Sequence, residues 1–289
     1  MRVFALRESG RLAFGLLGAL LLAAAVSALS LPGAHEGVQG FLAAMASRLL
    51  AYATFDLGSS AVSGLGAAQE LIARGPTTLT FVLQGIVIAA VFGIPPGLLS
   101  GAASLRNALA PLGQFVSAVP VFCAALLLAY VANRLLGPAL PGTPVALLPR
   151  DLAGWSQIVP PALTVGLAGM SAVQVGLRRA SVTLEDAPFR QGLGRLGLPE
   201  REIERFFVTP VVFAGLLNSL GEVIVALLSA TVVAEWVFHC PGIADLFVKS
   251  VALRDWNMVA LILFLFAATA MIADFAGRIA AHAVAREAA

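Results

Sequence analysis

The chain alternates between long apolar stretches and short polar segments that carry most of its charged residues. Six of the apolar stretches have 18 or more residues, and an α-helix of about 20 residues crosses roughly 30 Å of hydrocarbon. They are residues 12–31, 75–105, 107–133, 152–177, 206–234 and 256–273. This pattern predicts an all-α integral membrane protein with six transmembrane helices.

Composition supports a membrane location. Hydrophobic residues make up 59% of the 289 positions and charged residues only 12%, whereas soluble domains have about 25% charged residues. The mean hydropathy is +0.92. The net charge of +2 is too small to suggest a nucleic-acid partner. The two cysteines do not form a disulfide framework.

The first 31 residues have the order of charges and apolar residues that an anchor or a signal peptide would have. Arg2, Arg7 and Arg11 precede an apolar stretch of 20 residues. The apolar core of a signal peptide is shorter, about 7–15 residues. We therefore expect residues 1–31 to form an uncleaved N-terminal anchor helix, with cleavage as the alternative.

The placement of basic residues predicts the orientation, because cytoplasmic loops are enriched in arginine and lysine. With a cytoplasmic N-terminus, 12 arginines fall on the inner side and 6 basic residues on the outer side. The inner residues are Arg2, Arg7, Arg11, Arg106, Arg178, Arg179, Arg190, Arg195, Arg201, Arg205, Arg278 and Arg286, and the outer residues are Arg48, Arg74, Arg134, Arg150, Lys249 and Arg254. Both termini are therefore predicted to be cytoplasmic.

The predicted loops differ in length. Residues 32–74 form a long outer loop, and residues 75–289 contain the other five helices. The one inner loop of any size is 178–206. We expect a docking surface for a cytoplasmic partner in this loop.

Residues 188–210 read PFRQGLGRLGLPEREIERFFVTP and predict an elbow of two short helices. Pro199 can begin the second helix, because the N–H that proline lacks has no helical partner at that position. Glu200 and Glu202 then lie in the first turn, where acids complement the helix dipole. Three glycines are expected to interrupt the helix before it: Gly192, Gly194 and Gly197. The alternative is an ordinary solvated loop.

The same segment resembles a motif of ABC importer permeases. That motif is Glu-Ala-Ala, three residues, Gly, nine residues and Ile-x-Leu-Pro. Here Gln191–Leu193 take the place of the triplet, and Gly197 takes that of the glycine. Phe207, Thr209 and Pro210 follow at the matching spacing. The spacing agrees with the family, whereas the triplet departs from it.

Five further stretches resemble, in family order, motifs of the permeases of oligopeptide, dipeptide and nickel importers. They are FDLGSS at 55–60, GIPPG at 93–97, VPVF at 119–122, TVVAEWVFHCPGIA at 231–244 and RDW at 254–256. Each stretch is short, but their common order identifies the chain as similar to these permeases.

This resemblance implies a type I ABC importer permease fold in the inner membrane of a bacterial cell. It also implies partners: a second homologous permease subunit, two cytoplasmic ATPase subunits that bind ATP and Mg, and a periplasmic or lipid-anchored solute-binding protein. The chain itself would hold no cofactor and catalyse no reaction. It would form half of a pathway for a peptide-like or small polar solute, with nickel, opines, sugars and metal chelates as other possible cargoes. The resemblance makes the elbow the coupling helix, with these candidate ATPase-coupling residues: Arg190, Gln191, Gly192, Leu193, Gly194, Gly197, Leu198, Pro199 and Pro210.

Glu222 is the charge that lies well within a predicted span, where a charged side chain costs about 2.5–3.5 kcal/mol on insertion scales. It is expected to face water or protein. Helical spacing places Gly215, Asn218, Glu222, Ala226 and Ser229 on one face. Asn218, Glu222 and Ser229 are therefore candidate pathway residues, with Gln84 as a further candidate. The alternative is a helix-packing seam.

Other features narrow the function. The chain has no phosphate-binding glycine loop followed by Lys and Ser or Thr, so it is not the ATPase. The adjacent His239 and Cys240 supply too few ligands for a metal site. Residues 241–251 predict an amphipathic helix at the outer surface, with Asp245 and Lys249 on its polar side. The alternative function is a secondary ion-coupled transporter or another polytopic membrane protein without an ATPase partner. No repeat between the two halves supports the secondary transporter.

Overall fold

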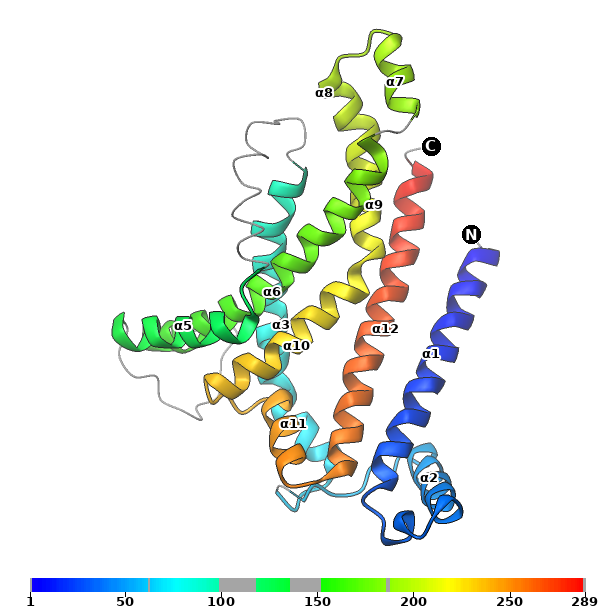
Figure 1. Ribbon diagram of the computed structural model, residues 1–289, viewed down its shortest axis with the longest axis vertical. Helices are drawn as coiled ribbons and strands as arrows, with labels where there is room; N and C mark the ends of the chain where they lie inside the picture. Colours follow the sequence, from blue (N-terminus) through cyan, green and yellow to red (C-terminus); the bar gives the residue numbers. More distant parts are fainter. Residues whose placement is uncertain (1, 62, 99–117, 136–151, 186–187, 288–289) are drawn as a thin grey trace.

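The computed structural model describes residues 2–61, 63–98, 118–135, 152–185 and 188–287 (Figure 1). These residues are mainly helical, and within these ranges only an isolated bridge between Ser59 and Gly66 has β geometry. The helices are α1 (Arg2–Ala28), η1 (Pro32–His35), α2 (Val38–Ala53), α3 (Ala67–Leu98), α5 (Val121–Leu135), α6 (Leu152–Glu185), α7 (Pro188–Arg195), α8 (Glu200–Ile203), the π-helical turn η3 (Glu204–Val208), α9 (Thr209–Asn218), α10 (Leu220–Val237), α11 (Ile243–Ala252) and α12 (Trp256–Glu287). The predicted all-α class is confirmed.

Five helices in the described part of the chain are long and apolar enough to cross a membrane. Their apolar segments are Phe4–Ala28, Ala67–Pro95, Ile158–Val182, Leu220–Val237 and Trp256–Val284. Of the predicted span 107–133, residues 107–117 lie outside the described residues, and the remainder contains the shorter apolar helix α5. The count of six transmembrane helices therefore stays a prediction.

The predicted span 206–234 is not one continuous helix. The π-helical turn leads into α9, and α9 and α10 meet at Ser219, whose φ of −98° and ψ of 6° are not helical. The Ser219 hydroxyl donates a hydrogen bond to the carbonyl of Gly215 at 3.2 Å. A serine hydroxyl that bonds the carbonyl four residues back favours a bend in a helix. No proline marks this position, so the hydrophobic pattern did not predict the break.

The helices form an elongated bundle with two distinct ends (Figure 1). Helices α7 and α8 lie at one end, the end of α12 and the start of α1 lie in the same half of the bundle, and α2 and α11 lie at the other end. Helix α1 packs along α12, and α6 packs along α3 and also contacts α5, α9 and α10. We refer to the two ends as the elbow end and the α11 end. The elbow and α11 are thus separated by most of the length of the bundle.

Glycines let α3, α6 and α10 approach one another closely. A side chain at Gly166 of α6 would collide with Ile88 of α3, and one at Gly85 of α3 would collide with Val165 and Leu227. Close contact through small residues is a common way of packing membrane helices, because lipid gives apolar helices little other reason to associate. Val165 and Leu227 are fully buried and belong to the apolar cluster at this contact.

The predicted outer loop 32–74 contains regular structure of its own. Helix α1 already ends at Ala28, η1 and α2 follow, and α3 begins at Ala67, before the predicted boundary at residue 75. The extra turns of α3 carry Glu70 and Arg74, which form an ion pair at 2.7 Å four residues apart. An i,i+4 pair of this kind supports a helix, which explains why helical structure starts before the continuous apolar stretch.

Candidate functional site

The elbow at 188–210 forms as two short helices joined by a turn, as predicted. Gly197 has a φ of +84°, in the left-handed region that favours glycine. The N–H of Leu198 donates to the carbonyl of Leu193 at 3.3 Å, and the N–H of Gly197 donates to the carbonyl of Gly194 at 3.0 Å. These two bonds define a Schellman motif, which ends a helix by satisfying its last carbonyls. Helix α7 therefore ends where Gly197 permits the chain to turn.

The structure differs from the predicted elbow in its glycines and, by one residue, in the start of the second helix. Gly192 and Gly194 do not interrupt the helix but lie inside α7, because a single glycine in left-handed geometry is sufficient to end it. Pro199 lies just before α8, and its carbonyl accepts the N–H groups of Glu202 and Ile203. The difference of one residue is within the usual uncertainty of helix ends.

The elbow is anchored on one side and exposed on the other. Leu193 and Leu198 are partly buried against the apolar cluster that contains Ile203 and Val208. Leu196, in the turn between them, is 77% exposed. In a Schellman motif, the two positions that Leu193 and Leu198 occupy here often make an apolar contact with each other. The arrangement presents a fixed turn with an apolar tip.

The remaining coupling candidates also lie on the elbow. Arg190 and Gln191 lie within α7, but their side chains are outside the described residues. Pro210 occupies the first turn of α9, directly after the π-helical turn. The π-helical turn between Ile203 and Thr209 connects the elbow directly to α9 and thence to α10.

Helix α10 has a single exposed face. Glu222, Val225, Ser229 and Trp236 are exposed and recur at helical spacing, whereas residues on the other faces, such as Leu227, are buried. A charged side chain is costly against lipid and is expected to face protein or water. This face, which we call the α10 face, is therefore not an ordinary lipid-facing surface.

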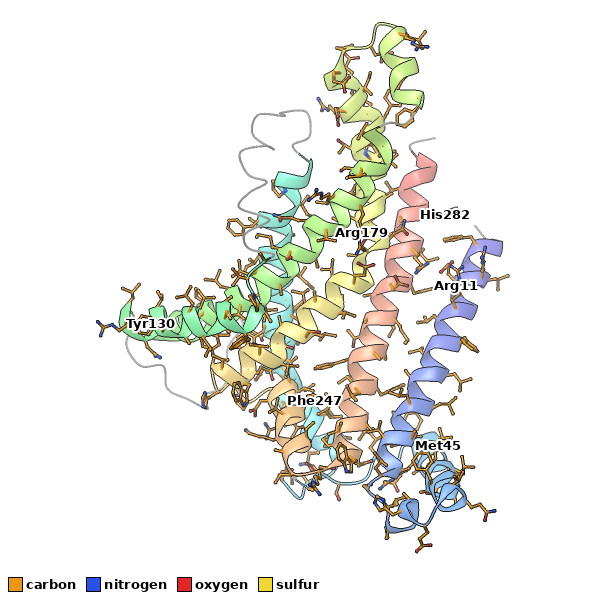
Figure 2. All side chains as sticks on the ribbon, in the orientation of Figure 1. Arg11, Met45, Tyr130, Arg179, Phe247 and His282 are labelled. Carbon is orange, nitrogen blue, oxygen red and sulfur yellow. The ribbon has the colours of Figure 1, made fainter. Side chains whose placement is uncertain are left out.

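An ion pair stands at the start of the α10 face. Arg179 lies on α6 (Figure 2). Its Nη1 lies 2.6 Å from Oε2 of Glu222, and both side chains are 63% exposed. The sequence indicated Glu222 as the charge that lies well within a predicted span. The structure instead presents positive and negative charge side by side at this position.

A cavity of about 600 Å³ lies between α1, α10 and α12. Leu12, Met271 and Phe275 contribute apolar lining. Val225 and Glu222 border it from the α10 face. The other charged residues that line it are Glu8, Arg11, Asp274 and Arg278. Since Arg11 pairs with Glu8 at 2.6 Å and Arg278 pairs with Asp274 at 2.8 Å, these charges largely compensate one another.

The four predicted pathway residues do not all come together. Ser229 lies on the α10 face with Glu222, and Asn218 is exposed at the end of α9. Gln84 lies on α3, next to the glycine that packs against α6, and is not among the described residues that line the cavity. Gly215 packs against Ala180 of α6, because the break at Ser219 interrupts the helical register that grouped it with Glu222.

A second polar cluster, which the sequence did not single out, lies at the α11 end. Glu235 in the last turn of α10 is fully buried. It accepts hydrogen bonds from the Thr78 hydroxyl at 2.6 Å and from the backbone N–H of Asp245 at 2.8 Å. Asp245 is itself buried, contrary to its predicted place on the polar side of α11. The available signal was an acid near the end of an apolar stretch, followed by Pro241 and Gly242.

His239 and Cys240 follow α10 in a tight turn. His239 is exposed, whereas Cys240 is buried. Burial raises the pKa of the Cys240 thiol to about 12, and the carboxyl groups of Glu235 and Asp245 act in the same direction. A thiol that stays protonated is a poor metal ligand. The chemistry of this pair therefore gives no support to a metal site.

Comparisons with known proteins agree with this architecture. Residues 76–286 match the family described as binding-protein-dependent transport system inner membrane component. The chain is 30% identical over 225 residues to the glutathione transport system permease protein GsiC of Escherichia coli O6:H1, which covers 73% of this chain and 67% of GsiC. It is 26% identical over 202 residues to the oligopeptide transport system permease protein AmiC of Streptococcus pneumoniae, which covers 68% of this chain and 39% of AmiC.

The family match extends from within α3 nearly to the end of α12 and includes the elbow, the α10 face and the cluster around Glu235. The chain belongs to the family of binding-protein-dependent transport system inner membrane components and is a permease subunit of an ABC importer of the inner membrane.

Proposed function

We propose that this permease subunit forms half of a translocation pathway and that the α10 face lines it. The observation that carries the proposal is that α10 is packed on all sides except the one with Glu222, Ser229 and Trp236. An exposed ion pair in a membrane protein favours a water-filled or protein-lined surface over lipid. A second, homologous permease subunit that faces the same surface would complete the pathway.

The elbow is the proposed site at which ATPase subunits act on the chain. Its turn is closed by the Schellman motif at Gly197 and anchored through Leu193 and Leu198. A docked ATPase that moves the exposed Leu196 would therefore move the elbow as a unit. The π-helical turn and α9, which meets α10 at Ser219, would carry that movement to the pathway. ATP and Mg would be bound by the partner subunits, and this chain would take no part in hydrolysis.

The proposed cargo is a peptide-like solute delivered by a solute-binding protein. The names of GsiC and AmiC give glutathione and oligopeptides as the solutes of those systems. In this chain, Arg179 and Glu222 offer both charge signs 2.6 Å apart at the α10 face. A short peptide carries an amino group and a carboxylate, so such a pair complements a peptide better than it complements a metal ion.

The proposed orientation places the elbow end and both termini in the cytoplasm. The arginine-rich start of α1, the end of α6 and the end of α12 lie in this half of the bundle (Figure 1). Cytoplasmic enrichment of arginine supports this direction. The α11 end then faces the binding protein.

Transport by the reconstituted importer tests the pathway. Glu222→Gln should lower binding-protein-dependent uptake of a labelled peptide, whereas Glu36→Gln, an exposed acid at the α11 end, should not. Equal uptake by the two variants would contradict the role of the α10 face. Uptake that survives ATP depletion while an ion gradient remains would instead favour a secondary transporter.

Cross-linking tests the elbow. In a Cys123→Ala background, which removes the exposed native cysteine, Leu196→Cys should form a cross-link to an ATPase subunit in the assembled complex. Leu253→Cys is the matched control, because Leu253 is 59% exposed but lies at the α11 end. Absence of a cross-link from Leu196→Cys in a complex that hydrolyses ATP would contradict the coupling role.

A further inference from the structure

Glu235 connects three helices through one buried carboxyl group. Its Oε1 accepts the Thr78 hydroxyl of α3 at 2.6 Å, and its Oε2 accepts the N–H of Asp245 of α11 at 2.8 Å. The Thr78 hydroxyl oxygen in turn accepts the N–H of Ile243, the first residue of α11, at 2.8 Å. The carboxyl group of α10 thus reaches the start of α11 directly and through α3.

These bonds replace a local helix cap. The first N–H groups of a helix have no partner within the helix and are usually satisfied by the side chain at the N-cap. The N-cap of α11 is Gly242, which has no side chain to offer. A side chain at Gly242 would collide with the Glu235 carboxyl group. Glycine at this position therefore admits the carboxyl group of another helix as the cap.

A second set of charges holds α11 to α3. The buried Asp245 pairs with Arg74 of α3 at 3.1 Å and with Lys249 of α11 at 2.6 Å. Arg74 also pairs with Glu70 at 2.7 Å. The position of α11 is therefore determined by α3 and α10 together, although only the five residues 238–242 connect α10 to α11 along the chain.

We propose that Glu235 is a positioning residue that makes α10 and α11 move as one body during transport. This inference rests on the proposed function of α10 as a pathway helix. Movement of the α10 face then displaces α11 at the outer surface. In the reverse direction, a binding protein that docks on α11 acts on the pathway through the hydrogen bonds of the Glu235 carboxyl group. Lys249 and Val251 near the end of α11 and Leu253 just after it are exposed and would offer the surface for this docking.

ATPase activity of the reconstituted complex tests the proposal. Glu235→Leu should leave basal ATP hydrolysis close to wild type and should lower its stimulation by the liganded binding protein about tenfold, a typical size for coupling between two sites. Glu235→Gln should retain most of the stimulation, because its amide oxygen can accept the Asp245 N–H and its NH₂ group can donate to Thr78. A merely structural role would lower basal and stimulated rates in proportion, and that result would overturn the proposal.

Thr78→Val provides a milder variant for the case in which Glu235→Leu does not assemble. It removes the hydroxyl that joins Glu235 to the N–H of Ile243, and it should weaken the stimulation by the binding protein. Thr80→Val is the matched control, because Thr80 is equally buried on α3 but points away from Thr78 by helical spacing. Equal stimulation in the two threonine variants would overturn the proposal.

A distance measurement tests the rigid connection itself. Spin labels at Val225 of α10 and Val251 of α11, in the Cys123→Ala background, should give one narrow distance that is the same without and with ATP. Thr78→Val or Glu235→Leu should broaden it, and an unchanged distribution in both would overturn the inference. If a binding protein does not stimulate ATP hydrolysis by the wild-type complex, the proposed function fails. If it stimulates the wild-type complex and stimulates Glu235→Leu and Thr78→Val as strongly as Thr80→Val, only the proposed role of Glu235 fails.

Discussion

Nη1 of Arg179 on α6 lies 2.6 Å from Oε2 of Glu222 on α10, and more than half of each side chain is exposed. The two residues belong to helices whose deeper parts pack together through buried apolar side chains. The packed part holds the helices in place, so the ion pair is free to serve recognition. We therefore expect the ion pair to contribute little to stability but to matter for transport.

Replacing either partner should change stability little. Exposed ion pairs contribute about 0–1 kcal/mol, so Arg179→Gln and Glu222→Gln should each leave the thermal midpoint of the purified subunit almost unchanged. The double variant should show a coupling energy below about 1 kcal/mol in a double-mutant cycle. A large loss of thermal stability in either single variant would show that the pair is a packing element rather than a recognition element.

The elbow offers two alanine substitutions with opposite expected signs. Gly197→Ala should destabilise the elbow by about 1–2 kcal/mol, because a residue with a Cβ is disfavoured at a φ of +84°. Gly194→Ala should stabilise α7 by roughly 0.5–1 kcal/mol, because alanine is the better helix former and the space around Gly194 is open. Protease sensitivity of the elbow in the purified protein measures both effects. Equal sensitivity of the two variants would contradict the Schellman geometry.

The sequence predicted the features that depend on neighbouring residues and missed those that depend on contacts between distant segments. The elbow was predictable because its determinants are local: a glycine, a proline and two acids within a few residues. The cap on α11 was not, because Thr78 and Glu235 are 157 positions apart and no local pattern links them. The break at Ser219 was also missed, because the predicted span 206–234 has no charge other than Glu222 and no proline near Ser219. Long apolar stretches thus predict which segments are helical but not which polar groups they bring together.

Asn257 provides a further test of how the α11 end is assembled. Its Oδ1 accepts the hydroxyls of Ser27 on α1 at 2.9 Å and Tyr52 on α2 at 3.1 Å, and its Nδ2 donates to the carbonyl of Leu57 at 2.8 Å. Burial raises the pKa of the Tyr52 phenol, so Tyr52 remains a donor at neutral pH.

Asn257→Leu should lower stability by about 1–3 kcal/mol, because it leaves buried polar groups without partners. Ser27→Ala should cost less, because it removes one donor and leaves the other two bonds in place. Thermal unfolding of the purified subunit compares the two variants. A smaller loss from Asn257→Leu than from Ser27→Ala would contradict the central place of Asn257 in joining α1, α2 and α12.

The two cysteines should differ sharply in reactivity. Thiolates are the reactive form, and the pKa of the buried Cys240 is raised to about 12, whereas Cys123 on α5 is exposed. At neutral pH a membrane-permeant maleimide should label Cys123, and a Cys123→Ala variant should remain unlabelled until it is unfolded.

Because the pKa of Cys240 is higher in the folded state, only the unfolded thiol ionises between the ordinary thiol pKa and about 12. Cys240 should therefore lower stability as the pH rises through this window and have no such effect below it. The Cys123→Ala variant and the Cys123→Ala/Cys240→Ala double variant should accordingly differ more in thermal midpoint at high pH than at neutral pH. Rapid labelling of Cys240 in the folded protein would contradict the closed packing of α11 against the end of α10.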